Sequence, residues 1–537
     1  MRPVEPIEIR TATGRKRPIY FGAKGRPLFG FYHPPREGPW RGVGVVLCPP
    51  IGTDRTRSDR TYRHLAERLA DAGFACLRFD LFGTGDSGGD ASAPGLLRQW
   101  LDDVGLAVQE VQARSGAQIV SLVGLRLGAT LAMLYAAERG AVDSLVVWSP
   151  YVSGTGFVGE TTKLHKLYLR IEPSLAGATP TQFDGEEALG MLLPRSLIDD
   201  LAKVDLLAVG RRPARRTLFI DGGNVQGRDA LMGRLRELGA DPELRSHPGH
   251  KFLITVSHRA TVPEEILESI GGWLTGAYPE LVPPKAIAER ASGPSPSGER
   301  PVRLGTDPPL FAIFTPADPA KARPGRPPIL VLNAGVVNRS GVHRMTVGMA
   351  RRWASLGFDV LRVDLSGIGD SPAAPGVPDS VTYPARAFED IAEAIRALDA
   401  PRIIVAGHCS GGDYAFQVGA RDARVAGAFI LNPRTFCVLE LSAVEGGAGA
   451  PVTDTVEDVP RTLRAMAERG VDTFLLVSPN DPGVTYVDAN AGESMRALGG
   501  VRGFERIDLP TTDHAFTPVD AQGRVSDALT EHLLAHY

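Results

Sequence analysis

The chain has 537 residues, of which 59 are basic and 62 acidic, giving a net charge of −3. That length predicts two domains of about 250 residues rather than one core. The balanced charge argues against nucleic acid as a partner. No apolar run approaches the roughly 20 residues that span a bilayer, which argues against a membrane protein.

The cysteines Cys48, Cys76, Cys409 and Cys437 are widely spaced and form no CxxC pair. This spacing argues against a disulfide scaffold and a zinc site, and it fits a reducing compartment. The amino-terminal residues contain no apolar segment of the kind found in secretory signals. We therefore expect a cytoplasmic protein with no metal site and no cofactor.

The first half of the chain alternates strand and helix patterns. Residues 42–49 (GVGVVLCP) form a short β-branched run, typical of a strand buried on both faces. Residues 60–73 (RTYRHLAERLADAG) place apolar residues at helical spacing and end at glycine, and residues 74–80 (FACLRFD) predict the next strand. Repeated βαβ units of this kind predict a mostly parallel sheet flanked by helices.

A further strand pattern at 118–124 runs into Gly-Leu-Arg-Leu-Gly at 124–128. This is the spacing of a nucleophile elbow, a strained strand-to-helix turn that projects its central side chain above the sheet. The central residue here is Arg126, which keeps its proton at working pH and so cannot attack. A surface or interdomain ion pair is the preferred interpretation of Arg126, and binding of a carboxylate or phosphate is the alternative.

The remaining catalytic positions of the first half are also degenerate. Val225 stands where an acid is expected, and only His250 matches a catalytic histidine. We therefore predict that residues 1–280 form a noncatalytic domain with an insertion at about 155–205 in the lid position. Residues 281–304, rich in Pro, Ser, Gly and charge, are predicted to be the linker.

Residues 305–537 are predicted to form a second domain of the same kind, because the chain resembles itself. Residues 332–374 repeat the pattern of residues 48–90, and Asp364 lies 284 positions after its match Asp80. A repeat of this length indicates a duplicated domain rather than a solenoid unit. The predicted fold class is α/β, with two tandem domains, each a mostly parallel sheet flanked by helices.

The second half carries an elbow with a nucleophile. A strand pattern runs into Gly407-His408-Cys409-Ser410-Gly411 and then into a helix pattern. The N–H of Ser410 is expected where an oxyanion would form, and the helix N-terminus favours a thiolate on Cys409. A buried structural thiol is the alternative for Cys409, and Ser410, one position off the elbow, is the alternative nucleophile.

The partners of this nucleophile are expected in the order acid, then histidine. Asp481 lies just past a strand pattern, in a PNDPG segment that also suits a turn, and His514 lies in a loop before the last helix pattern. Asp513 is a poorer candidate acid because it neighbours His514. A histidine oriented by a carboxylate within reach of Cys409 is the arrangement that activates a nucleophile.

The loop after the first parallel strand of the second half is expected to complete the site. The Val336 N–H takes the position of the second oxyanion donor. His343 and Arg344 on the same loop are candidates for holding an anionic substrate group, with a solvent-facing helix start as an equal alternative. Asp364 and Asp370 are expected to shape a loop rather than to catalyse.

With these motifs in order, the chain resembles the α/β-hydrolase superfamily. The second half resembles, more narrowly, the hydrolases associated with exosortase systems, through GHCSGG, FILNPR, RAMAERGVDTFLLVSPNDP and LPTTDHAF. The first half is similar to a sister group through LCPPIGTDRTRSDR, FDLFGTGDSGGD and WSPYVSG. The resemblance implies an acyl-transfer or ester-hydrolysis site. The second half departs from the pattern in its cysteine nucleophile and in the short Gly- and Ala-rich segment at 437–458, where a lid would be longer.

The cysteine suggests the substrate class. A thiol exchanges with a thioester at near-zero free-energy change, so an acyl group carried on an acyl carrier protein or coenzyme A is expected, with water, an amine or an alcohol as acceptor. The predicted function is acyl transfer or hydrolysis by an acyltransferase or thioesterase of a biosynthetic pathway. A cyclase or condensing enzyme on the same fold, or a noncatalytic binding scaffold, are the alternatives. The oligomeric state is not predicted.

Overall fold

The computed structural model describes residues 9–11, 14–140, 142–177, 181–223, 225–247, 260–282, 290–305, 308–436 and 456–537. Their contacts divide the chain into two compact units. The amino-terminal unit comprises Pro6–His165 and Phe183–Pro296, and the carboxy-terminal unit comprises Met1–Glu5, Lys166–Gln182 and Ser297–Tyr537. The division at Pro296 falls within the predicted linker, of which residues 283–289 lie outside the described part of the chain.

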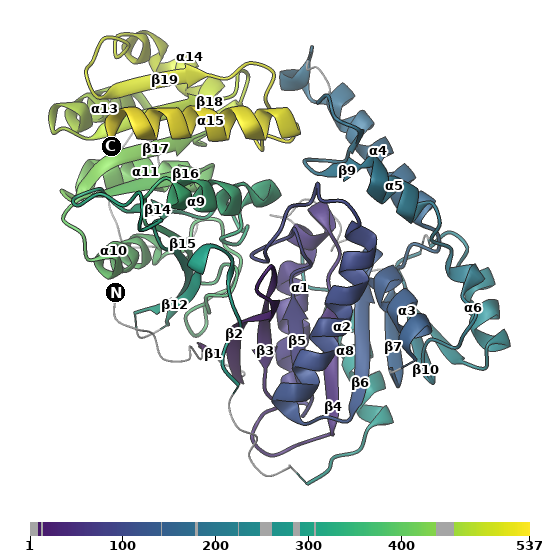
Figure 1. Cartoon of the computed structure of the whole chain (residues 1–537). Helices are drawn as coiled ribbons and strands as arrows, with labels where there is room; N and C mark the ends of the chain where they lie inside the picture. The colour runs from purple at the N-terminus through teal and green to yellow at the C-terminus, as the bar shows by residue number, and fades with distance from the viewer. Residues whose placement is uncertain are drawn as a thin grey trace. The chain divides into compact units, whose positions relative to one another are not determined.

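The amino-terminal unit is built on a nine-stranded sheet with the order β1-β2-β3-β5-β4-β6-β7-β10-β11 (Figure 1). The pairs β1–β2, β2–β3 and β3–β5 are antiparallel, and the remaining pairs are parallel. The strands are β1 (Ile9–Thr11), β2 (Gly14–Ala23), β3 (Arg26–His33), β4 (Val43–Cys48), β5 (Ala75–Phe79), β6 (Ile119–Leu125), β7 (Ser144–Trp148), β10 (Arg216–Asp221) and β11 (Asp241–Ser246). A separate antiparallel pair is formed by β8 (Gly185–Glu187) and β9 (Leu192–Pro194).

Helices cover both faces of this sheet. The helices are α1 (Gly52–Asp71), α2 (Leu96–Ser115), α3 (Leu127–Arg139), α4 (Gly154–Ile171), α5 (Arg195–Leu201), α6 (Arg228–Glu237) and α8 (Glu264–Ala277). Along β4, Val45 and Leu47 join the core under α1 and α8, whereas Val46 and Cys48 join the core under α2, α3 and α6. Both faces of the strand are buried, which explains why its sequence is apolar without alternation.

The carboxy-terminal unit repeats this plan with eight strands in the order β12-β13-β15-β14-β16-β17-β18-β19. The pairs β12–β13 and β13–β15 are antiparallel, and the others are parallel. The strands are β12 (Arg300–Leu304), β13 (Leu310–Thr315), β14 (Ile329–Val331), β15 (Val360–Asp364), β16 (Ile403–His408), β17 (Val425–Leu431), β18 (Asp472–Val477) and β19 (Phe504–Asp508).

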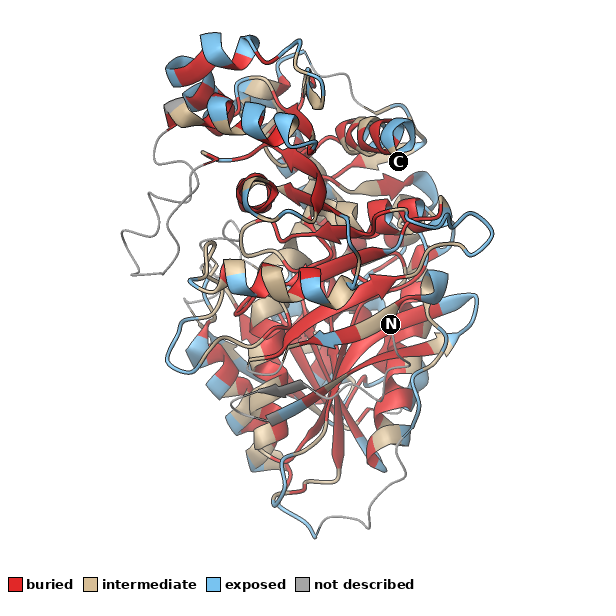
Figure 2. Ribbon diagram, turned by 90° about the vertical axis from the view of Figure 1, so that its left-hand side faces the viewer, coloured by how far each residue is buried: buried red, intermediate tan, exposed pale blue. Residues whose placement is uncertain are grey.

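The second sheet is likewise covered on both faces. Its helices are α9 (Met345–Ser355), α10 (Ala387–Leu398), α11 (Ser410–Arg421), α13 (Val459–Glu468), α14 (Pro482–Arg496) and α15 (Val519–His536). Trp353 of α9 and Leu529 of α15 share one core, and a second core gathers residues of α10, α11, α13 and α14. Figure 2 shows the inner strands of both sheets as buried, whereas the edge strands β11 and β19 are largely exposed or half-buried.

The two sheets share one topology. Apart from β1, each sheet begins with two strands that pair antiparallel. The next two strands lie in the reverse of their order along the chain, β5 before β4 in one sheet and β15 before β14 in the other, and the strands that follow are parallel to them. This confirms the predicted α/β class: two domains in tandem, each a mostly parallel sheet flanked by helices. The carboxyl ends of the parallel strands, where such folds place their sites, are therefore where the predicted catalytic residues have to meet.

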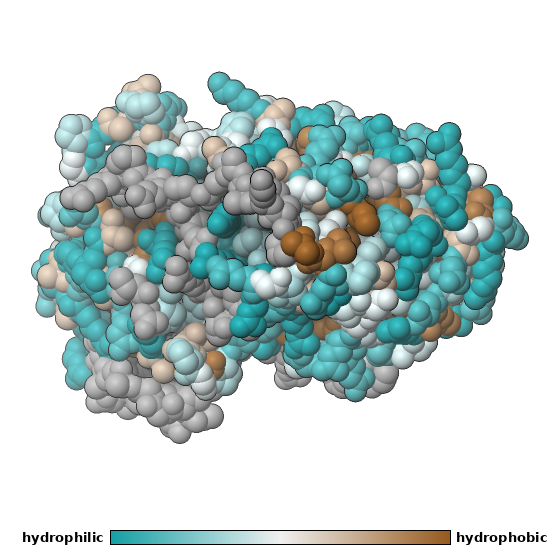
Figure 3. All heavy atoms as spheres, turned by 90° about the horizontal axis from the view of Figure 1, so that it is seen from below, coloured by the Kyte–Doolittle hydropathy of each residue, from teal (hydrophilic) through white to brown (hydrophobic). Residues whose placement is uncertain are grey.

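In the described part of the chain, no helix has both the length and the apolar character needed to cross a membrane. On the face drawn in Figure 3, hydrophilic side chains predominate and the strongly hydrophobic ones occupy small areas.

Candidate active site in the carboxy-terminal unit

Cys409 occupies a sharp turn between β16 and α11. Its backbone has φ 57° and ψ −123°, a left-handed conformation that side chains rarely adopt. The flanking glycines are required by space: a Cβ on Gly407 would lie 2.1 Å from the Gly411 carbonyl oxygen, and one on Gly411 would lie 2.5 Å from the Asn333 carbonyl oxygen. The turn leaves Cys409 partly exposed, as a nucleophile must be.

His514 lies between Cys409 and Asp481. Its Nδ1 is 2.5 Å from Asp481 Oδ2, and Cys409 lies close enough to influence the pKa of the imidazole. Burial alone would lower the pKa of His514, but the hydrogen bonds and negative charge of Asp481 and Cys409 raise that pKa to about 10. The arrangement therefore favours a protonated imidazole beside the sulfur at neutral pH.

Asp481 is the N-cap residue of α14. Its side chain is fully buried, and its Oδ1 accepts hydrogen bonds from the N–H groups of Gly483 (3.0 Å) and Val484 (3.4 Å). These bonds cap the helix and leave Oδ2 for His514. The turn-forming role and the predicted acid role of Asp481 are thus compatible, because different oxygens serve them.

Asp513, the alternative acid, has other partners. Its carboxylate accepts hydrogen bonds from the Thr517 N–H and hydroxyl, each at 2.6 Å. It also accepts one at 2.8 Å from the hydroxyl of Tyr168, a residue that belongs to this unit. Asp513 therefore fixes the loop that carries His514.

Ser410 follows Cys409, and its hydroxyl is directed to the neighbouring loop. The Oγ of Ser410 accepts a hydrogen bond from the Gly335 N–H at 2.9 Å, and the residue is 1% exposed. The side chain therefore links the elbow to the loop after β14 and is poorly placed to attack a substrate. Within the described residues, the N–H groups of Ser410 and Val336 hydrogen-bond to no protein group.

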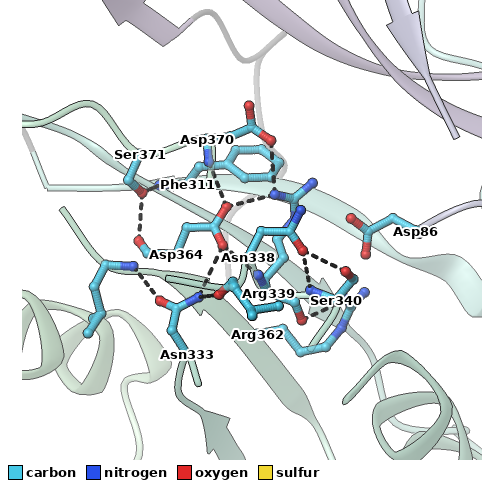
Figure 4. Close-up of polar contacts among 12 residues, drawn as sticks. Asp86, Phe311, Asn333, Asn338, Arg339, Ser340, Arg362, Asp364, Asp370 and Ser371 are labelled. Atoms are coloured by element: carbon cyan, nitrogen blue, oxygen red, sulfur yellow. Dashed lines mark hydrogen bonds and ion pairs between the residues drawn. The ribbon is translucent and has the colours of Figure 1, made fainter. Parts of the chain in front are cut away.

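Asp364 organises the loop that carries Val336 (Figure 4). Its Oδ1 accepts a hydrogen bond from the Arg339 N–H at 2.6 Å, and its Oδ2 lies 2.7 Å from the Arg339 guanidinium. The same guanidinium nitrogen is 3.0 Å from Asp370. At the start of the loop, Asn333 donates to the Val337 carbonyl at 2.9 Å and to Asp364 at 3.4 Å. Asp364 and Asp370 thus lie in a structural network, as the sequence suggested.

The amino-terminal unit contains the same network 284 positions earlier. Arg55 Nε is 2.9 Å from Asp80 Oδ1, and Asp80 Oδ2 accepts from the Asp86 N–H at 2.9 Å. The sequence comparison paired Asp80 with Asp364 but missed Arg55 and Arg339, which hold the same positions of the repeat. Searching the repeat for charge pairs at a constant offset would have found them.

His343 and Arg344 follow the loop in a short turn, each with a positive φ, of 52° and 65°. The Nε2 of His343 is enclosed without a hydrogen-bond partner in the described structure, and burial lowers the pKa of His343 to about 4. The nearby carboxylate of Asp513 opposes that shift, which places His343 beside the His514 loop. A neutral His343 is suited to hydrogen bonding rather than to charge pairing with an anion.

His408 was not singled out from the sequence. Its Nε2 is 2.7 Å from the His514 carbonyl oxygen, so that nitrogen is the donor, and the two rings lie 5.1 Å apart. Burial, together with the positive charge of His514, lowers the pKa of His408 to about 3. A permanently neutral His408 therefore positions the His514 loop from the strand that carries the nucleophile.

Tyr383 and Asp413 were also missed. The Tyr383 hydroxyl donates to Asp413 at 2.7 Å, and Asp413 accepts from the Phe436 N–H at 2.9 Å. Burial raises the pKa of Asp413 to about 6. Burial also raises the pKa of Tyr383, with further contributions from the charges of Asp413 and Cys409. Tyr383 therefore ties the segment before α10 to α11, the helix that begins at the elbow.

The amino-terminal unit keeps the elbow but fills it with an ion pair. Arg126 has φ 54° and ψ −124°, nearly the angles of Cys409. Its guanidinium lies 3.3 Å from Asp54, pairs with Glu160, hydrogen-bonds to Tyr151 and stacks on that ring at 4.3 Å. Arg126 therefore forms an ion pair, as expected, but within one unit and with its side chain only 15% exposed, rather than at the surface or between domains. Val225 packs against the core, and His250 lies outside the described residues.

Comparison with known proteins supports the fold class. Residues 55–208 match the family described as serine aminopeptidase, S33. This match falls on the half whose elbow holds Arg126, and it covers less than half of the chain. No curated protein matches the chain.

Solved structures that align with the chain each cover about one of its domains. Est1E from Butyrivibrio proteoclasticus, with ferulic acid bound, is 17% identical over 48% of this chain and 98% of its own, with a TM-score of 0.36. The thioesterase domain of a curacin biosynthetic pathway is 14% identical over 49% and 99%, with a TM-score of 0.31. A proline iminopeptidase of Mycobacterium smegmatis is 14% identical over 49% and 98%, with a TM-score of 0.34.

Proposed function

We propose that the carboxy-terminal unit is a cysteine-nucleophile acyltransferase or thioesterase that uses Cys409, His514 and Asp481. The observation that carries the proposal is the elbow position of Cys409 together with the 2.5 Å contact between His514 Nδ1 and the buried carboxylate of Asp481. A sulfur at a helix N-terminus, beside a histidine that favours its protonated form, is set up to react as a thiolate.

In the first half-reaction, the Cys409 sulfur attacks the carbonyl carbon of an acyl thioester and forms a C–S bond. The carbonyl π electrons move to oxygen, where the N–H groups of Ser410 and Val336 stabilise the oxyanion. Collapse breaks the bond to the leaving thiolate, and the His514 imidazolium gives that thiolate its proton. The product is an acyl-Cys409 thioester with a neutral imidazole beside it, oriented through Nδ1 by Asp481.

In the second half-reaction, His514 takes a proton from water, an amine or an alcohol as its oxygen or nitrogen attacks the acyl carbon. Collapse expels the Cys409 thiolate and restores the thiolate–imidazolium pair. A thioester donor on coenzyme A or an acyl carrier protein suits this cycle, because acyl-enzyme and substrate then have similar energies. We propose a role in a biosynthetic pathway, in the cytoplasm, and kinship with exosortase-associated hydrolases.

Residues 166–177 are proposed to shield the acyl-enzyme from water. They belong to the carboxy-terminal unit although they lie in the predicted lid insertion of the first half. Tyr168 supports this role because it hydrogen-bonds to Asp513, the residue before His514. Exclusion of water would favour transfer over hydrolysis.

Mass spectrometry of the full chain mixed with acyl-coenzyme A and N-acetylcysteamine thioester probes tests the proposal. An added acyl mass on the peptide of Cys409, absent from Cys409→Ala, is the expected result. The rival functions give different outcomes. Acylation followed by an internally cyclised product would indicate a cyclase, whereas no adduct with any probe would favour a noncatalytic scaffold and overturn the assignment.

A further inference from the structure

A second cluster of titratable side chains lies at the end of the last helix, away from the triad. His532 and His536 are one turn apart on α15 and face Asp472, the first residue of β18. Asp472 Oδ2 is 2.8 Å from His532 Nε2 and 3.1 Å from His536 Nδ1, and those two nitrogens are 2.9 Å apart. Three ligand-type atoms therefore form a small, nearly equilateral triangle.

The dimensions of this triangle match those of a metal site. Imidazole nitrogens and carboxylate oxygens bind Zn²⁺ and similar ions at about 2.0–2.1 Å. Neighbouring ligands at a right angle are then about 2.9 Å apart, and tetrahedral ligands about 3.4 Å apart. The observed distances of 2.8, 2.9 and 3.1 Å between the three atoms fit one face of an octahedron. Slightly longer distances between the same atoms would fit tetrahedral ligands.

The outer contacts of His532 point independently to a ligand. Its Nδ1 is 2.7 Å from Glu505 Oε2, which is the carboxylate–histidine pairing that orients metal-binding imidazoles. The ring is 3% exposed and packs at 4.4 Å from the ring of Phe474, so its orientation is fixed. A neutral imidazole has one N–H, yet both nitrogens of His532 face carboxylate oxygens. The second contact needs a positive charge, supplied by a proton or by a metal ion.

We propose that Asp472, His532 and His536 bind a divalent first-row transition metal, with Zn²⁺ as the expected ion. Two imidazoles and one carboxylate suit Zn²⁺, Co²⁺ or Ni²⁺, whereas Mg²⁺ and Ca²⁺ prefer oxygen ligands throughout. Asp472 starts β18 and the triad follows its other end, so the strand separates the two by about 16 Å. The metal therefore joins α15 to the sheet and takes no part in the acyl-transfer step.

The pattern was visible in the sequence as His-x-x-x-His on a helix. The expectation of no metal site came from the spacing of the cysteines, which contribute nothing here. The sequence could not indicate that Asp472 joins the two histidines, because Asp472 and His532 are 60 positions apart. The proposal is independent of the chemistry proposed for Cys409.

The test is a titration of the full chain with Co²⁺, followed by visible absorption, and with Zn²⁺, followed by calorimetry. A Cys409→Ala background removes the thiolate as a competing ligand. We expect one saturable ion per chain, with absorption bands of an imidazole-ligated Co²⁺, and a higher unfolding temperature with Zn²⁺. His536→Ala and Asp472→Asn should each weaken binding at least tenfold.

Glu531→Gln is the matched control, because it removes a charge from an exposed neighbour of His532 on the same helix. This variant should bind as the parent does. His536 is exposed, so its loss should not disturb folding, and circular dichroism of the metal-free variants checks that. Binding that is absent from the parent, or unchanged in both His536→Ala and Asp472→Asn, would overturn the proposal and leave a hydrogen-bonded clamp on α15.

Discussion

Replacing Arg339 by Met should be among the most destabilising changes in the carboxy-terminal unit. The guanidinium contacts Asp364 at 2.7 Å and Asp370 at 3.0 Å, and the three side chains are 0–2% exposed. Removing the cation leaves two buried carboxylates without their counter-charge. Breaking a buried ion pair in this way costs about 3–5 kcal/mol of the free energy of unfolding. The loss should also loosen the Val336 loop, since Arg339 donates its N–H to Asp364.

The amino-terminal unit supplies a matched control, Arg55→Met. The Arg55–Asp80 pair has the same place in the repeat, but its side chains are 12% and 11% exposed. Partial hydration should therefore make the loss smaller there. Denaturant-dependent hydrogen exchange, read by mass spectrometry on peptides of each unit, measures both losses in the full chain.

The destabilisation by Arg339→Met should also depend on pH. Burial already raises the pKa of Asp364 above 3.8, and loss of Arg339 removes the nearest charge that lowers it. An acid with a raised pKa in the folded state binds more protons there than when unfolded, so stability falls as pH rises through that window. The loss should be smallest near pH 4 and largest at neutral pH. A loss under about 1 kcal/mol, or one that does not change with pH, would refute the account of this network.

Three further predictions concern the site itself. Cys409→Ala should lower turnover by at least ~10³-fold in a steady-state thioesterase or transfer assay while the chain folds normally, and Cys409→Ser should keep weak activity; retained turnover in the alanine variant would direct attention to Ser410. Arg126→Ala should leave turnover within a few-fold, because the guanidinium is paired inside the other unit; a large loss would mean that the first elbow takes part in the reaction. Tyr168→Phe should raise KM, or raise hydrolysis relative to transfer, with little change in the acylation rate. Tyr486 is exposed, and Tyr486→Phe should change neither KM nor the ratio of hydrolysis to transfer. Equal behaviour of the two variants would remove the shielding role proposed for the segment that carries Tyr168.

The fold could be predicted because the repeat reports the same pattern twice. Strand runs such as 42–49 are buried on both faces, and the elbow glycines are required by contacts under 3 Å, so both leave clear traces in the sequence. The candidate triad could be named because its order along the chain follows from the strand order. Nothing local, however, predicts that Asp481 serves His514 through one oxygen and caps α14 through the other.

The residues that sequence reasoning missed act across long separations. His408 supports the His514 loop from 106 positions away, and Tyr383 contacts Asp413 from 30 positions away. Their roles depend on burial and on neighbours that only the folded chain brings together. His343 shows the reverse case, because the sequence suggested a charge for an anionic substrate and burial keeps that imidazole neutral.

The central claim is that His514 holds Cys409 as a reactive thiolate, and the pH dependence of alkylation by iodoacetamide tests it most directly. The contacts of His514 with Asp481 and Cys409 raise the pKa of His514 to about 10, and an imidazolium at this position would stabilise a thiolate on Cys409. An ordinary thiol loses reactivity below a pKa of about 8.5. Cys409 should therefore remain reactive well below that pH in the parent chain, and His514→Ala should move the profile to higher pH. Profiles that coincide in the parent and in His514→Ala would show that the two side chains do not interact and would contradict the account.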